Sequence, residues 1–203
     1  LKMKKILITQ RIDFLKDRNE VRESIDMNLS KLVLSLGMIP IQCSCKVSEK
    51  FSINEFLDNL SPDGIILSGG NNIGEYLERD NFEFALLSWS DTKKIPLFGI
   101  CRGLQILNSF CNGSLIKING HSNTRHIIYG EKEFDNLEVN SFHDFGVKIE
   151  NLGENLIVLA QTNDNCIEAL KHKNNPWLGV MWHPERETLF SKNDLAILHS
   201  HFK

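Results

Sequence analysis

A cysteine between two glycines is the residue best suited to chemistry in this 203-residue chain. It is Cys101, in the run Gly99-Ile100-Cys101-Arg102-Gly103, where an apolar stretch meets a segment of helical spacing. A nucleophile at the tip of a tight strand–turn–helix requires small flanking residues, because a side chain at either glycine would collide with the turn. The helix that follows directs its positive end at Cys101 and favours the thiolate, and the Arg102 N–H can donate to an oxyanion. The pattern predicts a cysteine nucleophile.

The tripeptide His183-Pro184-Glu185 supplies what such a nucleophile needs, a base and a group that orients the base. His183 is expected to take the proton of Cys101 and to deliver it to a leaving amine. Glu185 is expected to hold the imidazole and stabilise its cation, with the rigid Pro184 fixing their relative direction. Alone the tripeptide is a weak signal, since a single histidine is more often structural. Downstream of a cysteine elbow it predicts a Cys-His-Glu triad.

A glycine pair in Ser68-Gly69-Gly70-Asn71 follows another short apolar run. Glycines let backbone N–H groups approach a reacting carbonyl, so we expect Gly70 and Arg102 to form the oxyanion hole. Gly69 and Asn71 are then expected to contact the substrate. The alternative interpretation is a plain β-turn.

The first half of the chain alternates apolar runs with amphipathic segments. Runs without polar alternation indicate a parallel sheet that helices cover on both faces. Asp80 can cap one of these helices, with Glu83 at the capping-box position. The expected strands are 5–9, 38–42, 65–67 and 96–100, and the expected helices are 22–36, 51–60, the segment that begins at Asp80, and 104–110.

The second half has the pattern of strands joined by turns, followed by a final helix. The expected strands are 138–147, 156–160, 166–170 and 178–182, and the expected helix is 194–201. The segment 119–135 matches no pattern. Because no repeat, low-complexity tract or linker divides the chain, we predict one α/β domain over 1–203, with a central, mostly parallel sheet and helices on both faces.

Composition and charge argue against several classes of protein. Hydrophobic residues at 41% and charged residues at 24% are globular values, and a net charge of −3 gives no sign of a nucleic-acid or anionic-membrane partner. No apolar run approaches the roughly 18 residues of a membrane span, and residues 1–10 lack a signal peptide's apolar stretch, so we expect a cytoplasmic location. The five cysteines are an odd number, and Cys43 and Cys45 are too closely spaced for a zinc knuckle. We therefore expect no disulfide framework, no metal and no cofactor.

In this order the three segments resemble the class I glutamine amidotransferase superfamily, most clearly from 65 to 185. The resemblance implies a flavodoxin-like fold and acyl transfer from a γ-glutamyl amide. Further features are more similar to the γ-glutamyl hydrolase branch, peptidase family C26, than to amidotransferase subunits. These features are Arg79-Asp80 with Glu83, the arginine Arg102 after the nucleophile, and Asn140-Ser141-Phe142-His143.

The resemblance also implies which residues contact the substrate. Gln105 would contact the amino-acid end of a γ-glutamyl group. Ser141, Phe142 and His143 would line the same pocket, as would the residues that follow them up to Phe145.

Two departures from the family pattern bear on the leaving group. Asn71-Asn72 stands where many relatives carry an acid and a proline, and Asp144-Phe145 replaces a more usual His-Gln. A leaving group that bears phosphate needs cations or N–H donors, and Arg125 is the best candidate because a guanidinium binds phosphate in a bidentate way. His121 and His126 form either a polar wall for this group or part of the surface. Further candidate donors are Asn71, Asn72 and Arg102.

The implied reaction is hydrolysis through a thiol nucleophile. Cys101 attacks the γ-carbonyl, the amine leaves with a proton from His183, and water releases glutamate. The resemblance points most specifically to γ-glutamyl-CDP-amidate, split into CDP-amidate (cytidine diphosphoramidate) and glutamate in capsular phosphoramidate synthesis. The alternatives are a γ-glutamyl-aminobutyrate-type hydrolase, a glutaminase subunit that feeds ammonia to a synthetase partner, and a non-catalytic regulator, which the filled triad disfavours. We expect a small-molecule γ-glutamyl substrate and no obligate protein partner.

Overall fold

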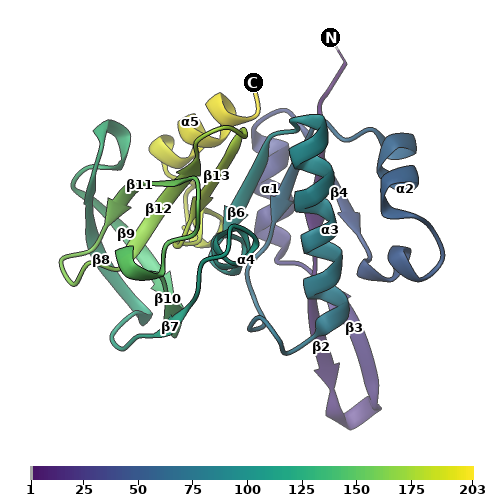
Figure 1. Ribbon diagram of the computed structural model, residues 1–203, viewed down its shortest axis with the longest axis horizontal. Helices are drawn as coiled ribbons and strands as arrows, with labels where there is room; N and C mark the ends of the chain where they lie inside the picture. Colours follow the sequence, from purple (N-terminus) through teal and green to yellow (C-terminus); the bar gives the residue numbers. More distant parts are fainter. Residues whose placement is uncertain (1) are drawn as a thin grey trace.

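A nine-stranded sheet forms the centre of the computed structural model, which describes residues 2–203 (Figure 1). The strands cross it in the order β4-β1-β5-β6-β13-β12-β11-β8-β9, and β2 with β3 and β7 with β10 form two small separate sheets. The strands are β1 Lys5–Thr9, β2 Arg11–Leu15, β3 Glu20–Ser24, β4 Ile39–Cys43, β5 Gly64–Leu67, β6 Leu97–Ile100, β7 Ile116–Lys117, β8 Ser122–Gly130, β9 Leu137–Phe142, β10 Phe145–Gly146, β11 Leu156–Gln161, β12 Ile167–His172 and β13 Trp177–Val180. The helices are α1 Met27–Ser35, α2 Ile53–Leu60, α3 Leu77–Lys93, α4 Arg102–Phe110 and α5 Lys192–His201.

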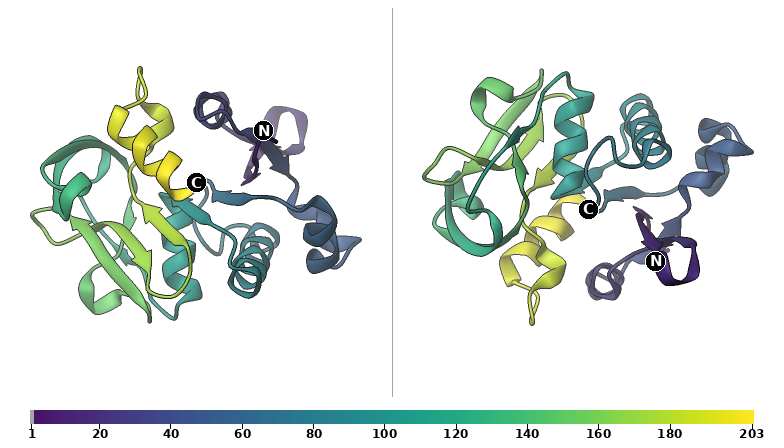
Figure 2. Two further views of the ribbon diagram at one scale, coloured as in Figure 1. Left: turned by 90° about the horizontal axis from the view of Figure 1, so that it is seen from above. Right: turned by 90° about the horizontal axis from the view of Figure 1, so that it is seen from below.

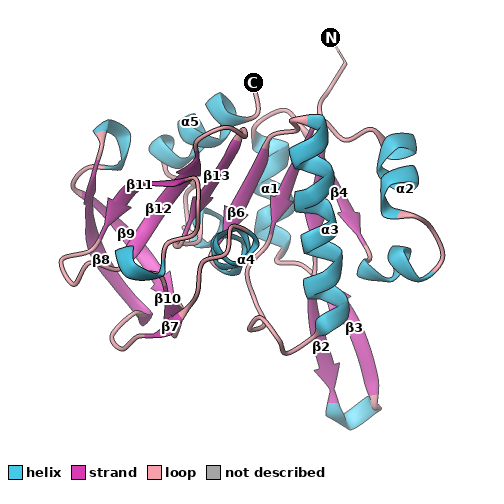
Figure 3. Ribbon diagram, in the orientation of Figure 1, coloured by secondary structure: helices cyan, strands magenta, loops and turns pink. Residues whose placement is uncertain are grey.

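One part of the central sheet is parallel and the other is antiparallel. Strands β4, β1, β5, β6 and β13 run in the same direction, whereas β12, β11, β8 and β9 continue the sheet as antiparallel neighbours. Figure 2 shows α1 and α5 on one face and α3 and α4 on the other, and Figure 3 shows that strands and loops dominate the antiparallel part. The predicted α/β class with helices on both faces is confirmed. None of the helices within residues 2–203 is both long and apolar enough to cross a membrane.

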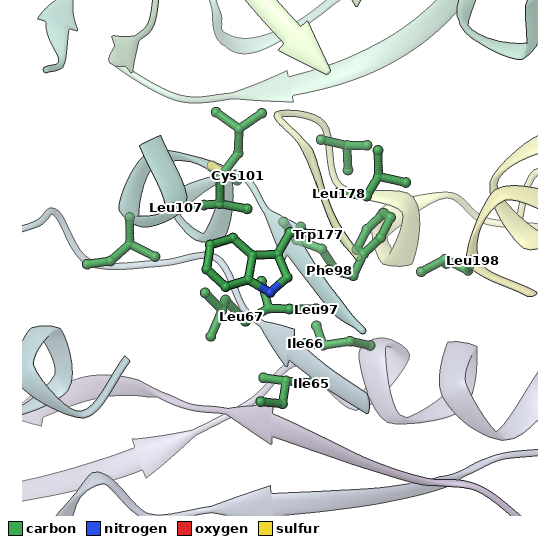
Figure 4. Close-up of a cluster of buried hydrophobic side chains, with 14 of the residues drawn as sticks. Ile65, Ile66, Leu67, Leu97, Phe98, Cys101, Leu107, Trp177, Leu178 and Leu198 are labelled. Atoms are coloured by element: carbon green, nitrogen blue, oxygen red, sulfur yellow. The ribbon is translucent and has the colours of Figure 1, made fainter. Parts of the chain in front are cut away.

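The central strands β5 and β6 are buried along their whole length because helices cover both of their faces. Every residue of Gly64–Leu67 and of Leu97–Ile100 is buried, as expected for continuous apolar runs in a parallel sheet. Figure 4 shows side chains of β5, β6 and β13 together in the core around Trp177. Since parallel strands end at a common edge, β5, β6 and β13 bring the glycine pair, Cys101 and the His-Pro-Glu segment together there.

The region between β1 and α1 differs from the prediction. The helix expected at 22–36 is wrong in its first part, because residues 22–24 belong to strand β3 and α1 begins only at Met27. The β2–β3 hairpin projects from the sheet (Figure 1) and is largely exposed, with Phe14 47% and Val21 62% exposed. An exposed hairpin gives no apolar periodicity, so the pattern missed it.

The capping role expected of Asp80 and Glu83 is also wrong. Helix α3 begins at Leu77, so both carboxylates lie within the helix, where they are buried. The Asp80 carboxylate accepts a hydrogen bond from the Gly74 N–H at 2.7 Å, and both carboxylates pair with Arg102. An Asp-x-x-Glu spacing also places two acids on one face of a helix, which is the arrangement found here.

The remaining predicted elements are found, with two exceptions in the second half. The strand expected at 138–147 is broken at His143, where β9 has ended and β10 has not begun. The unmatched segment 119–135 contains β8, which pairs with β9. The other strands and helices differ from prediction by no more than about two residues at their ends, the usual fraying of such boundaries.

Candidate active site

Cys101 occupies the tight turn between β6 and α4. Its φ of 51° lies in the left-handed region, which costs a non-glycine residue about 1–3 kcal/mol and is typical of functional turns. A Cβ on Gly99 would lie 2.5 Å from the carbonyl carbon of Gly103, and one on Gly103 would lie 2.2 Å from the Leu67 oxygen. Both flanking glycines are therefore required. The Cys101 N–H donates to the Val180 carbonyl at 2.8 Å, which ties the elbow to β13.

His183 follows β13 and directs its imidazole at Cys101. Its Nδ1 lies 2.6 Å from Oε1 of Glu185 and donates to that carboxylate, which leaves Nε2 for the sulfur. All three side chains are buried. Burial disfavours the imidazolium, but hydrogen bonds to Cys101 and Glu185 outweigh it and raise the pKa of His183 to about 9. At neutral pH the histidine therefore holds a proton that it can give to a leaving group.

Asn140 fixes the backbone of His183. The His183 N–H donates to Asn140 Oδ1 at 2.9 Å, and Asn140 Nδ2 donates back to the His183 carbonyl at 2.9 Å. The same Nδ2 donates to Glu187 Oε1 at 2.8 Å. One side-chain amide thus satisfies both backbone groups of the histidine, so β9 positions a residue that lies outside the sheet.

The glycine pair lies directly against the imidazole. A Cβ on Gly69 would be 2.7 Å from Cε1 of His183. The buried Arg79 guanidinium donates to the carbonyl oxygens of residues 68, 69 and 70 at 2.8, 3.0 and 2.6 Å. In a trans peptide the C=O and the following N–H point in opposite directions. The N–H groups of Gly70 and Asn71 therefore point away from Arg79, so the contact with Arg79 leaves them free to donate elsewhere.

A buried ion cluster lies behind the elbow. Arg79 Nε contacts Glu83 Oε1 at 3.1 Å, and the Arg102 guanidinium pairs with Asp80 and Glu83. Burial opposes the ionisation of Glu83, but Arg102 and Arg79 hold its pKa below the ordinary value. The Arg102 guanidinium is thus occupied by its ion pairs. The backbone N–H of Arg102, at the first position of α4, has no intrahelical acceptor. The structure thus suits the predicted backbone role of Arg102.

One hollow reaches Cys101 from the side of α4. Its volume is about 280 Å³, and Gln105 and Phe145 line it with the cysteine. Gln105 Nε2 donates to the Phe145 carbonyl at 2.9 Å, which joins α4 to β10. The carboxylate-bearing residues Glu75 and Asp144 also line this hollow, which we call the acyl hollow.

A second hollow of about 300 Å³ lies on the His183 side of the elbow, and we call it the amine hollow. Arg11 and Gly70 line both hollows, so the glycine pair separates them. Arg186 also lines the amine hollow, and its guanidinium lies 4.7 Å from the centre of the Phe142 ring. Its separation from the Glu185 carboxylate is 3.9 Å. Arg186 therefore makes only a loose ion pair there and can serve a ligand.

The predicted substrate residues line these hollows with one exception. Gly69 lines the amine hollow, and Asn71, Gln105, Phe142 and His143 line the acyl hollow. Ser141 reaches neither, because it is fully buried and its hydroxyl donates to the His121 carbonyl at 2.5 Å. Its expected substrate contact is corrected: side chains alternate along β9, so Ser141 faces away from the side on which its neighbour Phe142 lies.

Arg125 is not placed for the phosphate-binding role expected of it. Its guanidinium pairs with Glu187 at 2.9 Å and Glu138 at 3.2 Å, and it lines neither hollow. Arg11 and Arg186 are instead the cations at the site, and reasoning from the sequence missed both. Two signals pointed to them, since Arg11 follows β1 at the edge where parallel strands bind ligands, and Arg186 follows the triad acid directly.

Comparison with known proteins gives consistent matches. Residues 16–202 match the family described as Glutamine amidotransferase class-I. The gamma-glutamyl-CDP-amidate hydrolase of Campylobacter jejuni subsp. jejuni serotype O:2 is 34% identical over 204 residues, which cover 96% of this chain and 96% of the relative. The gamma-glutamyl-gamma-aminobutyrate hydrolase of Escherichia coli O157:H7 is 29% identical over 194 residues, 75% of each chain. A solved structure, that of a glutamine amidotransferase from Thermotoga maritima, has the same fold, with a TM-score of 0.68 at 16% identity over 98% of this chain and 84% of that one.

Proposed function

Since this chain belongs to the class I glutamine amidotransferase family, we propose that it hydrolyses γ-glutamyl-CDP-amidate to CDP-amidate and glutamate. The observation that supports this most is the similarity to the Campylobacter hydrolase across 96% of both chains. The assembled group of Cys101, His183 and Glu185 supports it from the side of chemistry. The proposal places the enzyme in the synthesis of capsular phosphoramidate.

Acylation begins at the elbow. The Cys101 sulfur attacks the γ-carbonyl carbon, and the carbonyl electrons move to oxygen. In the proposal the N–H groups of Gly70 and Arg102 donate to that oxygen, and stabilising the developing charge is the largest contribution that such a site makes. Cys101 holds a φ of 51°, a strained conformation of the kind found at functional turns.

Departure of the amine and hydrolysis both use His183. Its imidazolium gives a proton to the leaving nitrogen as the C–N bond breaks, which leaves a thioester on Cys101. The neutral imidazole then takes a proton from water, which attacks the thioester and releases glutamate. The pKa of about 9 keeps the imidazole protonated before the first step. Glu185 stabilises each imidazolium that forms.

The acyl hollow suits the glutamyl part of the substrate. Its volume of about 280 Å³ is sufficient for an amino acid, and Cys101 lies in its wall. The carboxylates of Glu75 and Asp144 match an α-ammonium group. Arg11, whose Nε pairs with Asp13 at 2.8 Å, has its terminal N–H groups left for an α-carboxylate. This part of the substrate is common to all γ-glutamyl amides, so the acyl hollow gives the reaction its class but not its leaving group.

The amine hollow then receives the leaving group. His183 lies in its wall, as required for protonation of the amine. Arg186 is the cation best placed for a phosphate, because its loose ion pair with Glu185 at 3.9 Å leaves its N–H groups available. Arg186 also holds Phe142 by a cation–π contact of 4.7 Å. The carboxylates of Asp13, Asp26 and Glu185 also line this hollow, so the proposal assigns the phosphate contact to Arg186 alone.

The proposal is tested by the initial rate of glutamate release from three substrates, γ-glutamyl-CDP-amidate, γ-glutamyl-γ-aminobutyrate and free glutamine. The purified chain alone should act fastest on the first, and Cys101→Ala protein should act on none. A faster rate with γ-glutamyl-γ-aminobutyrate would discard the nucleotide substrate and keep the hydrolase. Glutamine hydrolysis that appears only after addition of a synthetase would favour the glutaminase alternative.

A further inference from the structure

A second group of chemically capable side chains lies in the antiparallel part of the molecule. His121 precedes β8, His143 follows β9, Cys166 directly precedes β12 and Glu168 is the second residue of β12. All four are buried, with Glu168 and Cys166 at 0% exposure. One ligand atom from each of His121, Cys166 and Glu168 lies within 4.8 Å of the other two. His143 also lines the acyl hollow, but none of the four side chains takes part in the proton transfers of the proposed hydrolysis.

The hydrogen bonds of His121 and His143 fix which of their nitrogens carries a proton. His121 Nε2 lies 3.1 Å from the Asp164 carboxylate and His143 Nδ1 lies 3.0 Å from the Phe145 carbonyl. Both partners are acceptors, so each of these nitrogens must be an N–H. In the neutral imidazole the other nitrogen then carries a lone pair. Those nitrogens are His121 Nδ1 and His143 Nε2.

Both lone pairs face one carboxylate, whose other oxygen, Oε2, lies 3.3 Å from Nε2 of a third imidazole, that of His126. His121 Nδ1 lies 3.5 Å and His143 Nε2 lies 3.4 Å from the same oxygen, Oε1 of Glu168. Neither nitrogen and neither Glu168 oxygen has a hydrogen-bond partner of acceptable geometry. Three acceptors facing one another in a buried space repel, unless a cation lies among them. That cation is either an extra proton on each imidazole or a metal ion.

We propose that His121 Nδ1, the Glu168 carboxylate and the Cys166 sulfur bind one divalent zinc-class metal ion. His143 Nε2, which lies outside that 4.8 Å group but 3.4 Å from Glu168 Oε1, moves in as the fourth ligand. Tetrahedral zinc, with bonds of about 2.0–2.3 Å, holds its ligands roughly 3.4 Å apart. The two nitrogen–oxygen separations, 3.5 and 3.4 Å, already have this value. Two imidazoles, one carboxylate and one thiolate are ligands for zinc rather than for calcium or magnesium, which prefer oxygen throughout.

Burial and the charge of Glu168 raise the pKa of the Cys166 thiol to about 12. The metal-free protein therefore keeps this thiol protonated, and metal binding releases the proton as the sulfur–metal bond forms. One proton leaves and no electron is transferred. Since four protein ligands fill a tetrahedron, the site is structural rather than catalytic.

The surroundings of the cluster are those of a metal site. Asp164 orients His121 through Nε2, and the Thr162 hydroxyl donates to Asp164 in turn. A carboxylate behind a ligating imidazole is the usual outer partner of zinc. The Asp164 side chain is 51% exposed, so the cluster lies just beneath the surface and an ion has a short route to it.

A zinc titration of Cys101→Ala protein, freed of metal and competed against a chromophoric chelator, tests the proposal. This background removes the triad thiol, so Cys101 and His183 do not form a competing thiolate site. One equivalent of zinc per chain should bind, and the melting temperature should rise with zinc concentration. Cobalt(II) in place of zinc should give thiolate-to-metal charge-transfer absorption, which Cys166→Ser should abolish.

Substitutions in the same background separate this site from other histidines and thiols. His121→Ala should weaken zinc binding by more than about 100-fold, and Asp164→Asn, at a half-exposed outer partner, by about 10–100-fold. The matched controls His199→Ala, on the exposed side of α5, and Cys111→Ser, a buried thiol elsewhere, should bind as the parent does. If His121→Ala fails to fold, Asp164→Asn decides the question. Failure of the parent to bind one equivalent, or unchanged affinity in folded Asp164→Asn, would overturn the proposal.

Discussion

The molecule contains two buried groups in which imidazole meets carboxylate, one at Cys101 and one around Glu168. In the first, Nδ1 of His183 faces a carboxylate and Nε2 faces a thiol. In the second, both nitrogens of His121 face carboxylates, Asp164 and Glu168. The partner of the second nitrogen therefore decides the chemistry. A thiol can exchange its proton with the ring, whereas a second acceptor demands a cation between the two.

The two groups also differ in their place in the fold. The triad lies where the parallel strands β6 and β13 end, and such an edge leaves hollows for a substrate. The group around Glu168 lies between antiparallel strands, with Cys166 and Glu168 fully buried and His143 at the border of the acyl hollow. A catalytic group must be accessible to substrate, whereas a structural metal site is best kept from solvent. The following predictions test this contrast, from the largest effect to the smallest.

Loss of the nucleophile should have the largest effect. Cys101→Ala should lower glutamate release from γ-glutamyl-CDP-amidate by about 10⁴-fold or more, as expected when a triad loses its reacting atom. His183→Ala should be comparable. Single-turnover kinetics measure the rate, and circular dichroism melting checks that the fold is intact. Substantial turnover by folded Cys101→Ala protein would rule out the thiol mechanism.

Loss of the orienting acid should cost less and change the pH profile. Glu185→Gln should lower the rate on the order of 10²-fold, the range of a perturbed acid–base group. The pKa of His183, raised to about 9, means that the rate falls as pH rises through about 9 and the imidazolium is lost. Glu185→Gln removes a group that raises this pKa, so the alkaline fall should move to lower pH. An alkaline limb that stays in place would mean that Glu185 does not act on the histidine.

The same raised pKa makes a prediction about stability. The extra proton affinity of His183 stabilises the fold fully below the unfolded-state pKa of about 6.5 and less as pH rises through about 9. Urea unfolding of the wild type should therefore show a free energy of unfolding that declines across this window. His183→Ala protein serves as the control and should show a flatter profile there.

The corresponding change in the second group should affect stability more than turnover. Glu168→Gln removes the carboxylate that three imidazoles surround, at 3.3, 3.4 and 3.5 Å. We expect the free energy of unfolding to fall by about 3 kcal/mol, since breaking a buried ion pair leaves uncompensated charge. The single-turnover rate of the folded variant should change by less than about tenfold, or about 1.4 kcal/mol. If Glu168→Gln lost as much rate as Glu185→Gln, the group around Glu168 would not be purely structural.

The smallest effects should come from two surface arginines, one that lines the amine hollow and one that does not. Arg186, beside the triad, lines the amine hollow, whereas Arg125, on β8, already pairs with Glu138 and Glu187. Arg186→Ala should raise KM for γ-glutamyl-CDP-amidate about tenfold, equivalent to about 1.4 kcal/mol, and leave γ-glutamyl-γ-aminobutyrate unaffected. Arg125→Ala is the matched control and should alter neither KM. Equal effects of Arg186→Ala on both substrates would exclude a phosphate contact.

The sequence determined the parts of this protein that rest on local rules. Two glycines around Cys101 define the elbow because a Cβ at either position would meet backbone atoms, at 2.5 and 2.2 Å. Buried parallel strands read as continuous apolar runs, so the α/β class was evident as well. The predicted family and the predicted class of enzyme, a γ-glutamyl hydrolase, are confirmed by the relatives.

The tertiary structure decided what depends on partners distant along the chain. Asp80 and Glu83 have the spacing of a helix cap, yet they pair with Arg102, because α3 packs behind the elbow. Arg125 had the right chemistry for phosphate, but strand pairing places it beside Glu138. In each case the side chain's chemistry is local, whereas the charge of its neighbours is set by the fold.

The histidines show the same limit. Their types are written in the sequence, but the protonation of His121 follows from Asp164 on one side and Glu168 on the other, both more than 40 positions away along the chain. A histidine donates, accepts or binds a metal according to which atoms face its two nitrogens. Only folding brings those atoms together, so the sequence could name the triad but not the group around Glu168.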